Sequence, residues 1–359
     1  MGGCSSQEPE TAKNDEAAGE QDDDCHIMGL DKDDEPKLDP KDFISRKLRS
    51  EIVFRSPGAL KGQSFTIDNC KDCSFFLFDN TAAVTIDDCS RCTFFVGPCE
   101  SSVFVRNCRD CKMIVACRQF RTRQCKDMDV MLFCAAGQPI IEMSERIRFG
   151  AFNYTYFSLN GQFETAHMHV WDTEWSNVYD FTKGNGEEAD SKEEAKNWGF
   201  LPVGISPVTL LGMRPHEVCE DIKEEESKLS CPVPPAWGTR PLPPTDGWEW
   251  ECCFVLVPGD DEDTLHSIRE WVDFKESQIL IKRSRTRKLS DIEVSNLCRT
   301  LGYTGKIQLK GGLYIGVEVI GRECIKRLPQ KCGSRTVTSV SPEISKSAAV
   351  TFFDALAHI

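Results

Sequence analysis

The chain has 359 residues, of which 40% are hydrophobic and 9% aromatic, enough to build the cores of two domains rather than a disordered or collagen-like chain. Its net charge of −14 argues against a nucleic-acid-binding protein. The sequence has neither an apolar run long enough to span a bilayer nor a hydrophobic signal segment at its N-terminus. We therefore expect a protein that is not secreted, whose 19 cysteines are reduced thiols rather than a disulfide framework.

Residues 1–40 predict a disordered acidic arm. They contain 13 Asp and Glu residues against three lysines, and so hold 10 of the 14 net negative charges. Like charges repel, and almost no aliphatic side chain that could support a core precedes Ile27. Folded structure is expected to begin at residue 41.

The start of this arm carries a lipidation pattern. Gly2 after Met1, followed by Ser6, fits N-myristoylation, and Cys4 is a neighbouring candidate for S-palmitoylation. A single myristoyl chain binds membranes with K of about 10⁴ M⁻¹, so a stable anchor needs a second signal. Because anionic lipids repel the acidic arm, that signal must be a second lipid, on Cys4. The alternative is an ordinary small, polar N-terminus without lipids.

A cysteine repeat predicts a β-solenoid. Residues 65–73, 84–92 and 103–111 each end in Cys-x₂-Cys, and their first cysteines are 19 residues apart. A fourth copy has Cys125 and then Met128 in place of the second cysteine. An alternating apolar run follows each pair, as in a strand, and short strands at a fixed repeat length are typical of stacked solenoids.

The residues after the repeat predict the end of the solenoid. The run 140–150 resembles a further coil. The aromatic stretches 154–157 and 171–181 are expected to cap the final coil, whose strand edge would otherwise stay unpaired. His167 and His169, in the same region, are interpreted as structural rather than metal-binding residues.

Zinc is the competing interpretation of the cysteine pairs, because the pairs Cys70/Cys73 and Cys89/Cys92 have the spacing of a zinc ribbon. Three observations favour buried structural thiols. The pairs occur three times rather than two or four, Met128 would be a poor ligand beside thiolates, and the residues between the pairs alternate like strands. Small apolar thiols also suit the narrow interior of a β-helix. No metal is therefore expected, and a zinc-bound structural adaptor is the alternative.

The second half of the chain predicts a linker and a small α/β domain. Residues 202–250 include nine of the 18 prolines and are interpreted as a semi-extended linker, with a short helix over the charged stretch 220–228. Apolar patterns then predict alternating strands and helices over 251–359. The predicted strands are 252–257, 278–282 and 313–319, and the predicted helices are 263–272, 289–301 and 322–328.

The coils resemble the C-CAP, or cofactor C-like, domain of the retinitis pigmentosa 2 protein family. The resemblance rests on residues 84–89, 106–112, 119–121, 138–142 and 175–181. It implies a right-handed parallel β-helix over 41–201, followed at 251–359 by a small ferredoxin-like α/β domain of the nucleoside-diphosphate-kinase type. Neither His266 nor His358, the histidines after the linker, lies in the Asn-x-x-His setting of active kinases, so phosphotransfer is not expected.

The resemblance also implies a function, the activation of GTP hydrolysis by an ARF-like small GTPase in its GTP form. In this family an arginine supplied in trans neutralises charge that develops on the phosphates, an effect worth about 10³–10⁵ in rate, and it falls on Arg121. On spacing alone, Arg121 would be an ordinary solvated side chain. The resemblance places six further residues at the nucleotide or the partner: Ser101, Ser102, Arg118, Gln119, Phe120 and Glu142. GTP and Mg²⁺ would be bound by the partner, and the protein would hold no cofactor of its own.

Two of these positions depart from the pattern of the family. Arg118 replaces a glutamine, and Ser101 replaces a glycine. Arg118 could donate to phosphate or to the partner surface. Glu142 could contact the partner, or it could pair with a neighbouring arginine such as Arg146 or Arg148 within the chain.

Together with the lipidation pattern, the resemblance implies a protein anchored at the cytoplasmic face of the plasma membrane, in the cilium or at the basal body. There it would act in the release and trafficking of lipidated cargo. A soluble tubulin-folding chaperone similar to cofactor C, which would act on GTP hydrolysis by tubulin, is the alternative. No nucleic acid is expected as a partner.

Overall fold

The computed structural model describes residues 39–182, 197–213, 231–236, 238–239, 250–274, 278–305 and 307–353. The lipidation residues Gly2 and Cys4, the acidic arm up to residue 38 and the helix expected at 220–228 lie outside the described residues. The described part begins with a short 3₁₀ helix, η1 (Pro40–Phe43), capped by the Asp39 side chain. None of the helices described is long and apolar enough to cross a membrane.

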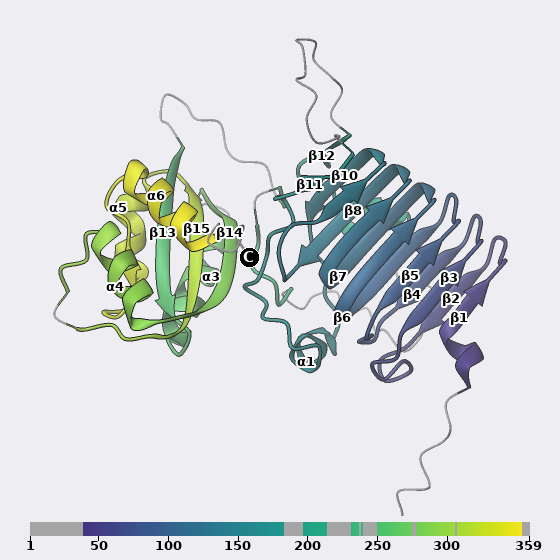
Figure 1. Ribbon diagram of the computed structural model, residues 1–359, viewed down its shortest axis with the longest axis horizontal. Coiled ribbons are helices and arrows are strands. Elements are labelled where there is room, and N and C mark those ends of the chain that lie inside the picture. Colours follow the sequence, from purple (N-terminus) through teal and green to yellow (C-terminus); the bar gives the residue numbers. More distant parts are fainter. Residues whose placement is uncertain are drawn as a thin grey trace, which may run out of the picture. The chain divides into compact units, whose positions relative to one another are not determined.

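Parallel strands stacked in successive coils form the larger of two sheets (Figure 1). Its strands are β1 (Ile44–Arg46), β2 (Ile52–Arg55), β3 (Phe65–Asp68), β4 (Ser74–Leu77), β5 (Val84–Asp87), β6 (Thr93–Arg106), β7 (Arg109–Arg123), β8 (Lys126–Cys134), β9 (Ile140–Glu142), β10 (Glu145–Ala151), β11 (Tyr179–Asp180) and β12 (Trp198–Phe200). Their pairings are parallel, so each residue lies beside its counterpart one coil away, as Ile86 lies between Ile67 and Val105. The predicted β-solenoid is confirmed.

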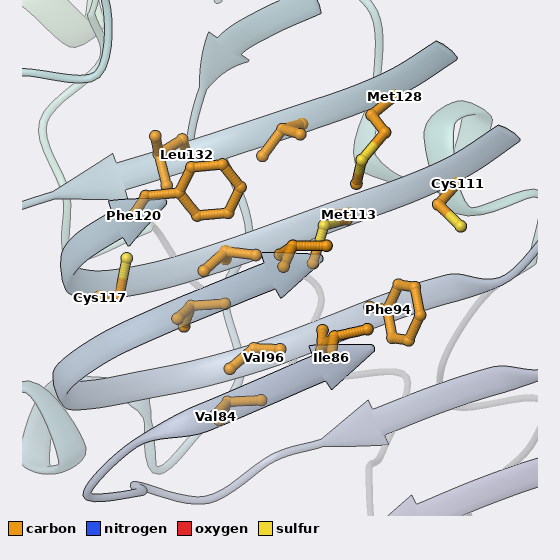
Figure 2. Packing of buried hydrophobic residues seen from close by; sticks show 14 of the residues in the cluster. Val84, Ile86, Phe94, Val96, Cys111, Met113, Cys117, Phe120, Met128 and Leu132 are labelled. Atoms are coloured by element: carbon orange, nitrogen blue, oxygen red, sulfur yellow. The ribbon is translucent and has the colours of Figure 1, made fainter. Parts of the chain in front are cut away.

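The interior of the coils is apolar (Figure 2). Side chains alternate along each strand, so that Val84 and Ile86 of β5 are buried while Thr85 between them is partly exposed. Phe75 stacks on Phe94 of the next coil, with ring centroids 5.4 Å apart. Because burial of such a side chain contributes about 1.5–3 kcal/mol, and each one packs against the next coil, the coils stabilise one another.

The corners between strands account for the Asn and Asp residues of the repeat. The residue before each cysteine of a pair has a left-handed backbone, with φ of 53° at Asn69 and 57° at Asp72, a conformation that Asn and Asp adopt more readily than most residues. The cysteine that follows is buried and its Sγ donates to the carbonyl two residues earlier, at 3.4 Å for Cys70 and 3.2 Å for Cys73. Burial raises the pKa of the Cys70 thiol to about 11, which keeps it protonated at neutral pH.

The structure contains a first coil, before residue 65, that the sequence analysis missed. β1 and β2 are joined by a corner at which Lys47 and Ser50 have the left-handed backbone. Leu48 packs against the interior there, in the place that a cysteine takes in the next coil. In the final coil the place is taken by Ser144, whose buried hydroxyl accepts a hydrogen bond from the Cys125 amide. The corner geometry, rather than the cysteine, is therefore what these coils share.

A second apolar cluster covers an outer flank of the coils. Phe76, Phe78 and Phe95 belong to it; Phe76 and Phe95 lie on the same strands as interior residues, and Phe78 directly follows β4. The Tyr156 ring meets Phe78 edge-on at 5.0 Å between centroids, and helices α1 (Leu159–Thr165) and α2 (Pro207–Leu211) complete the cover. The stretch 154–157 therefore packs on a flank, and the prediction that it caps the final coil is wrong.

The two ends of the other aromatic stretch, 171–181, pack in different parts of the structure. Trp171 packs in a core cluster of the C-terminal sheet, so its predicted role in the cap is wrong. Tyr179 in β11 pairs with Ile140 of β9, and β12 pairs with β10. β11, at the end of this stretch, and β12, outside it, thus pair with the strands of the last coil.

The described parts of the predicted linker are packed rather than free. Leu210 and Leu211 of α2 are buried on the flank of the coils, together with Val233. Arg269 donates to the carbonyls of Cys231 and Pro232, the latter at 2.8 Å. The linker interpretation is therefore wrong for these parts.

The C-terminal region forms a four-stranded antiparallel sheet with the order β14-β15-β13-β16. Its strands are β13 (Glu251–Pro258), β14 (Ile279–Leu289), β15 (Gly312–Gly321) and β16 (Val337–Thr338), and its helices are α3 (Glu262–Asp273), α4 (Asp291–Thr300), α5 (Cys324–Arg327) and α6 (Pro342–Phe353), with a 3₁₀ turn η5 (Leu328–Lys331) after α5. This is the β-α-β, β-α-β arrangement of a ferredoxin-like fold with α4 added between the halves. Apolar clusters cover both faces of the sheet.

Three features of this region differ from the prediction. β14 continues to Leu289, and α4 begins only after Ser290, which forms a capping box with Glu293. β16 and α6 were not predicted. The second half of β14 is rich in Arg and Lys, so its sequence lacks the apolar pattern from which strands are predicted. In the structure, neighbouring elements supply acidic and aromatic partners for these charged side chains.

The structural-thiol interpretation predicts a protein without bound zinc. Within the described ranges, no three His, Cys, Asp or Glu side chains are grouped so that they could hold a metal ion. Elemental analysis of the purified protein should therefore find zinc well below one equivalent, and a chelator should leave the unfolding midpoint unchanged. Stoichiometric zinc whose removal unfolds the protein would contradict this prediction, because structural zinc contributes directly to folding.

Candidate functional site

The site residues predicted from the sequence gather on one face of the coils, along β6, β7 and the end of β9. Along β7 the side chains alternate, so that Gln119 and Arg121 are exposed while Phe120 and Thr122 are buried. Phe120 meets Phe149 edge-on inside the solenoid. It therefore supports the strand from within, and its ring is not available to a partner.

Arg121 is the free arginine of this face. Its register neighbours one coil away are Phe104 and Ile140, neither of which offers a side-chain acceptor. The Arg121 side chain is exposed and, within the described part of the chain, its guanidinium forms no hydrogen bond or ion pair. All its donors are therefore available to another molecule.

Arg118 is held by the backbone instead. Its Nε donates to the Glu100 carbonyl at 2.7 Å, and its Nη2 donates to the carbonyls of Ala166 and His167 at 3.3 and 3.0 Å. Ala166 is the C-cap of α1, so Arg118 supplies the positive charge that favours a helix C-terminus. In this structure Arg118 is a clamp between β6 and the C-terminal end of α1, and it does not point freely from the face as Arg121 does.

The two serines lie beside the clamp. Ser101 is exposed, and Ser102 donates to the Gln119 side-chain oxygen at 3.2 Å. β6 has irregular register with β7 between Val96 and Ser102. Ser101 thus lies in a short outward bend of β6, where the Cβ that distinguishes it from the glycine of the family is exposed.

Glu142 pairs with neither of the arginines suggested by the sequence. Its Oε1 lies 3.7 Å from Arg123 Nε, because β9 stacks on β7 and places Glu142 beside Arg123. Arg146 pairs with Asp127, and Arg148 pairs with Asp129. The alternative that Glu142 pairs with a neighbouring arginine is therefore confirmed, but the arginine is Arg123 rather than Arg146 or Arg148. Glu142 stays partly exposed at the edge of the face that carries Arg121.

A hollow of about 310 Å³ lies next to Arg121. Its lining includes Gln119, Arg121, Ala136, Gln138, Tyr179 and Phe181. The sequence analysis did not assign Gln138, Tyr179 or Phe181 to the site. Tyr179 and Phe181 were assigned to the cap, but their side chains are 45% and 57% exposed and their rings meet at 4.5 Å between centroids. An exposed aromatic pair beside a free arginine is typical of a binding surface.

The imidazoles of His169 and His266 take no part in this site. His169 Nδ1 accepts a hydrogen bond from the Trp171 amide, and burial lowers the pKa of His169. His266 lies on the exposed side of α3, where it pairs with Glu270. His358 lies outside the described residues.

Comparison with known proteins identifies the class of the coiled domain. The family model for tubulin binding cofactor C matches residues 62–181, from just before β3 to the end of the hollow. The chain therefore contains a cofactor C-type domain.

The similarity extends further along the chain for one group of relatives. Protein XRP2 of Danio rerio is 52% identical over 170 residues, which are 47% of this chain and 43% of the relative. Protein XRP2 of Gallus gallus is 45% identical over 228 residues, 64% and 60% of the two chains. Protein XRP2 of Homo sapiens is 41% identical over 241 residues, 67% and 65%. These matches confirm the resemblance predicted from the sequence, although they span less than two thirds of each relative.

The different environments of the two arginines predict effects of different size on stability. Arg118→Ala leaves three carbonyls without their donor, so the free energy of unfolding should fall by about 1–3 kcal/mol. Arg121→Ala removes no contact within the described residues and should change it by less than about 0.5 kcal/mol. Urea denaturation of both variants measures the difference. A loss of stability for Arg121→Ala equal to that for Arg118→Ala would contradict the assignment of the clamp.

Proposed function

We propose that this protein activates GTP hydrolysis by an ARF-like small GTPase and that Arg121 is the arginine supplied in trans. The observation that carries the proposal is the freedom of Arg121: an exposed guanidinium without an intramolecular partner among the described residues, next to a hollow with exposed aromatic rings. The similarity to Protein XRP2 and the cofactor C domain supports the proposal.

The chemistry of the reaction suits an arginine held in this way. Hydrolysis by small GTPases is slow because the charge that develops on the phosphates is poorly neutralised, and an added arginine accelerates it by about 10³–10⁵-fold. Its planar fork can donate two hydrogen bonds to phosphate oxygens and stays charged. Arg121 stands on a strand paired on both sides, so its backbone is fixed before the partner arrives, which limits misplacement of the guanidinium.

The remaining site residues are proposed to bind rather than to react. Gln119 and Ser102, which are hydrogen-bonded to each other, would face the nucleotide side. Tyr179, Phe181 and Glu142 would contact the partner surface. GTP and Mg²⁺ would be held by the GTPase, and the C-terminal domain would dock or scaffold rather than transfer phosphate.

Tubulin is the second candidate partner, since the family model that matches the coils is named for tubulin binding. The features that favour an ARF-like GTPase are the lipidation pattern and the C-terminal domain, because a soluble chaperone needs no membrane anchor. Both partners would use the same arginine. The comparison of hydrolysis with each partner therefore separates the two proposals.

Replacement of Arg121 should remove most of the stimulation while largely preserving binding. A group that acts on charge developing in the transition state affects rate more than ground-state affinity. In single-turnover assays with GTP-loaded ARF-like GTPases, Arg121→Ala should lower the stimulated rate by about 10³-fold or more. Arg121→Lys should restore little of it, because an ammonium cannot reproduce the two-pronged donation.

Arg118→Gln is the matched control, because it replaces the neighbouring arginine with the residue of the family. It should keep much of the stimulation, although the clamp is weakened. If Arg121→Ala stimulated like wild type and Arg118→Ala did not, Arg118 would have to be the arginine that acts in trans.

We further propose that myristoyl on Gly2 and palmitoyl on Cys4 anchor the protein at the cytoplasmic face of the plasma membrane, in the cilium or at the basal body. This location would place a GTPase activator where lipidated cargo is released. Two chains are required because a single myristoyl chain binds only marginally.

The anchor proposal predicts graded effects on membrane binding. Gly2→Ala should release the protein from membranes. Cys4→Ser should leave it myristoylated but reversibly bound, with an association constant of about 10⁴ M⁻¹. Fractionation of cells that express each variant measures both effects. Cys4→Ser bound as firmly as wild type would refute the two-lipid anchor.

A further inference from the structure

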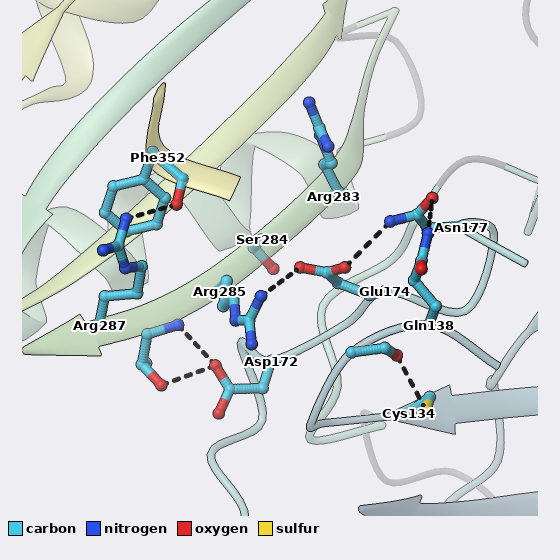
Figure 3. Close-up of polar contacts among 12 residues, drawn as sticks. Cys134, Gln138, Asp172, Glu174, Asn177, Arg283, Ser284, Arg285, Arg287 and Phe352 are labelled. Carbon is cyan, nitrogen blue, oxygen red and sulfur yellow. Dashed lines mark hydrogen bonds and ion pairs between the residues drawn. The ribbon is translucent and has the colours of Figure 1, made fainter. Parts of the chain in front are cut away.

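We infer that Arg285 and Glu174 are positioning residues for the proposed activating face, joined to it by a chain of polar contacts that begins on β14 (Figure 3). This inference rests on the proposed function and deepens it, because it makes the C-terminal sheet a determinant of the surface around Arg121. The contacts involve residues 171–177, called here the bridging segment.

The bridging segment is fixed to β14 by its backbone. Ser284 Oγ donates to the Trp171 carbonyl at 2.5 Å, and the Thr173 amide donates to the Ser284 carbonyl at 2.9 Å. Asp172 Oδ1 accepts from the amide and the hydroxyl of Thr286, at 2.6 and 2.7 Å. Burial raises the pKa of Asp172 to about 6, while its hydrogen bonds with Thr286 act to lower it.

A chain of side chains then leads from β14 to the hollow. Arg285 Nη1 lies 3.2 Å from Glu174 Oε1, with side chains only 14% and 3% exposed. The other Glu174 oxygen accepts from Asn177 Nδ2 at 3.4 Å, and Asn177 Oδ1 accepts from Gln138 Nε2 at 3.0 Å. Gln138 lines the hollow together with Arg121.

The last contact in this series of polar side chains joins the two segments that line the hollow. Gln138 precedes Pro139, whose carbonyl accepts from the Tyr179 amide at 2.8 Å, and the Phe181 amide donates to the Ile141 carbonyl at 2.8 Å. The hydrogen bond between Gln138 and Asn177 thus joins the two segments that lead into β9 and β11. Displacement of a catalytic group by about 1 Å can lower the rate about 10²-fold. We therefore expect these polar contacts to affect the stimulated rate of hydrolysis, although none of them touches the nucleotide.

The simpler alternative is that Arg285 only adds cohesion to the C-terminal sheet, and β14 provides a matched control for it. Arg287 lies two residues further along the strand, is also 14% exposed and is also 3.2 Å from a glutamate, Glu293. Arg287 Nη1 donates to the Phe352 carbonyl at 2.7 Å. Among the described residues its partners, Glu293 and Phe352, both lie in the C-terminal region, so loss of Arg287 weakens that region without breaking the polar contacts that lead to Gln138.

Hydrogen–deuterium exchange of the full-length protein tests the positioning itself, without a GTPase. Arg285→Met should raise exchange of the Tyr179 and Phe181 amides about tenfold, and Arg287→Met should change it less than about twofold. Asn177→Ala cuts the same chain without leaving a buried charge, and should give the same increase if Arg285→Met folds poorly. Arg285→Lys should restore part of the protection. Unchanged exchange in both Arg285→Met and Asn177→Ala, or an equal increase in Arg287→Met, would overturn the inference.

Single-turnover hydrolysis then tests the consequence for activation. Arg285→Met and Asn177→Ala should lower the maximal stimulated rate about tenfold, with a smaller change in the half-saturating concentration, and Arg287→Met should stimulate like wild type. Wild-type protein that stimulates no ARF-like GTPase would refute the proposed function, and the exchange experiment would then decide the positioning alone. Stimulation by wild type together with full activity of both chain variants would overturn the inference and leave the proposed function standing.

Discussion

Parallel stacking in constant register is the constraint on which the rest of the structure depends. Each inward side chain must fit the equivalent side chain of the coils above and below, as Ile86 does between Ile67 and Val105. Each corner must also turn the chain inward within a few residues, which requires left-handed backbone and favours Asn and Asp. Cysteine side chains fill the space inside the corners of several coils, and Leu48 and Ser144 show that other side chains can take the same position.

The same register decides which surface charges are satisfied. An acidic residue in one coil and a basic residue in the next are neighbours, as in Asp87–Arg106 and Asp129–Arg148. These rows are exposed, so each pair is worth little by itself, but it occupies the guanidinium. Arg121 is not part of such a pair, because the residues in register with it in the neighbouring coils are Phe104 and Ile140. The free arginine is thus a consequence of two apolar neighbours rather than of any special feature of its own position.

The sequence predicted the coils from residue 65 onward, because cysteine spacing and strand alternation are local patterns. It could not predict the first coil, whose corner lacks the cysteines, nor the flank position of residues 154–157, since both the flank and the end of a solenoid accept aromatic side chains. For the site, the family resemblance pointed to Arg121. Only the structure distinguishes it from Arg118, because the acceptors of Arg118 are carbonyls, and one of them lies 49 residues away. Tyr179 and Phe181 were missed as site residues for the same reason: their neighbours come from β9.

A free arginine on a fixed strand has a consequence for the thermodynamics of docking. The backbone of β7 is hydrogen-bonded to the coil on either side, so its conformational entropy is lost when the protein folds. When a partner engages Arg121, the ordering cost at this point is confined to the side-chain torsions, about 2 kcal/mol for arginine. An arginine on a disordered loop would add about 1–2 kcal/mol for every loop residue that became fixed. If Arg121 engages a partner as proposed, the solenoid would therefore keep the entropic cost of that contact low.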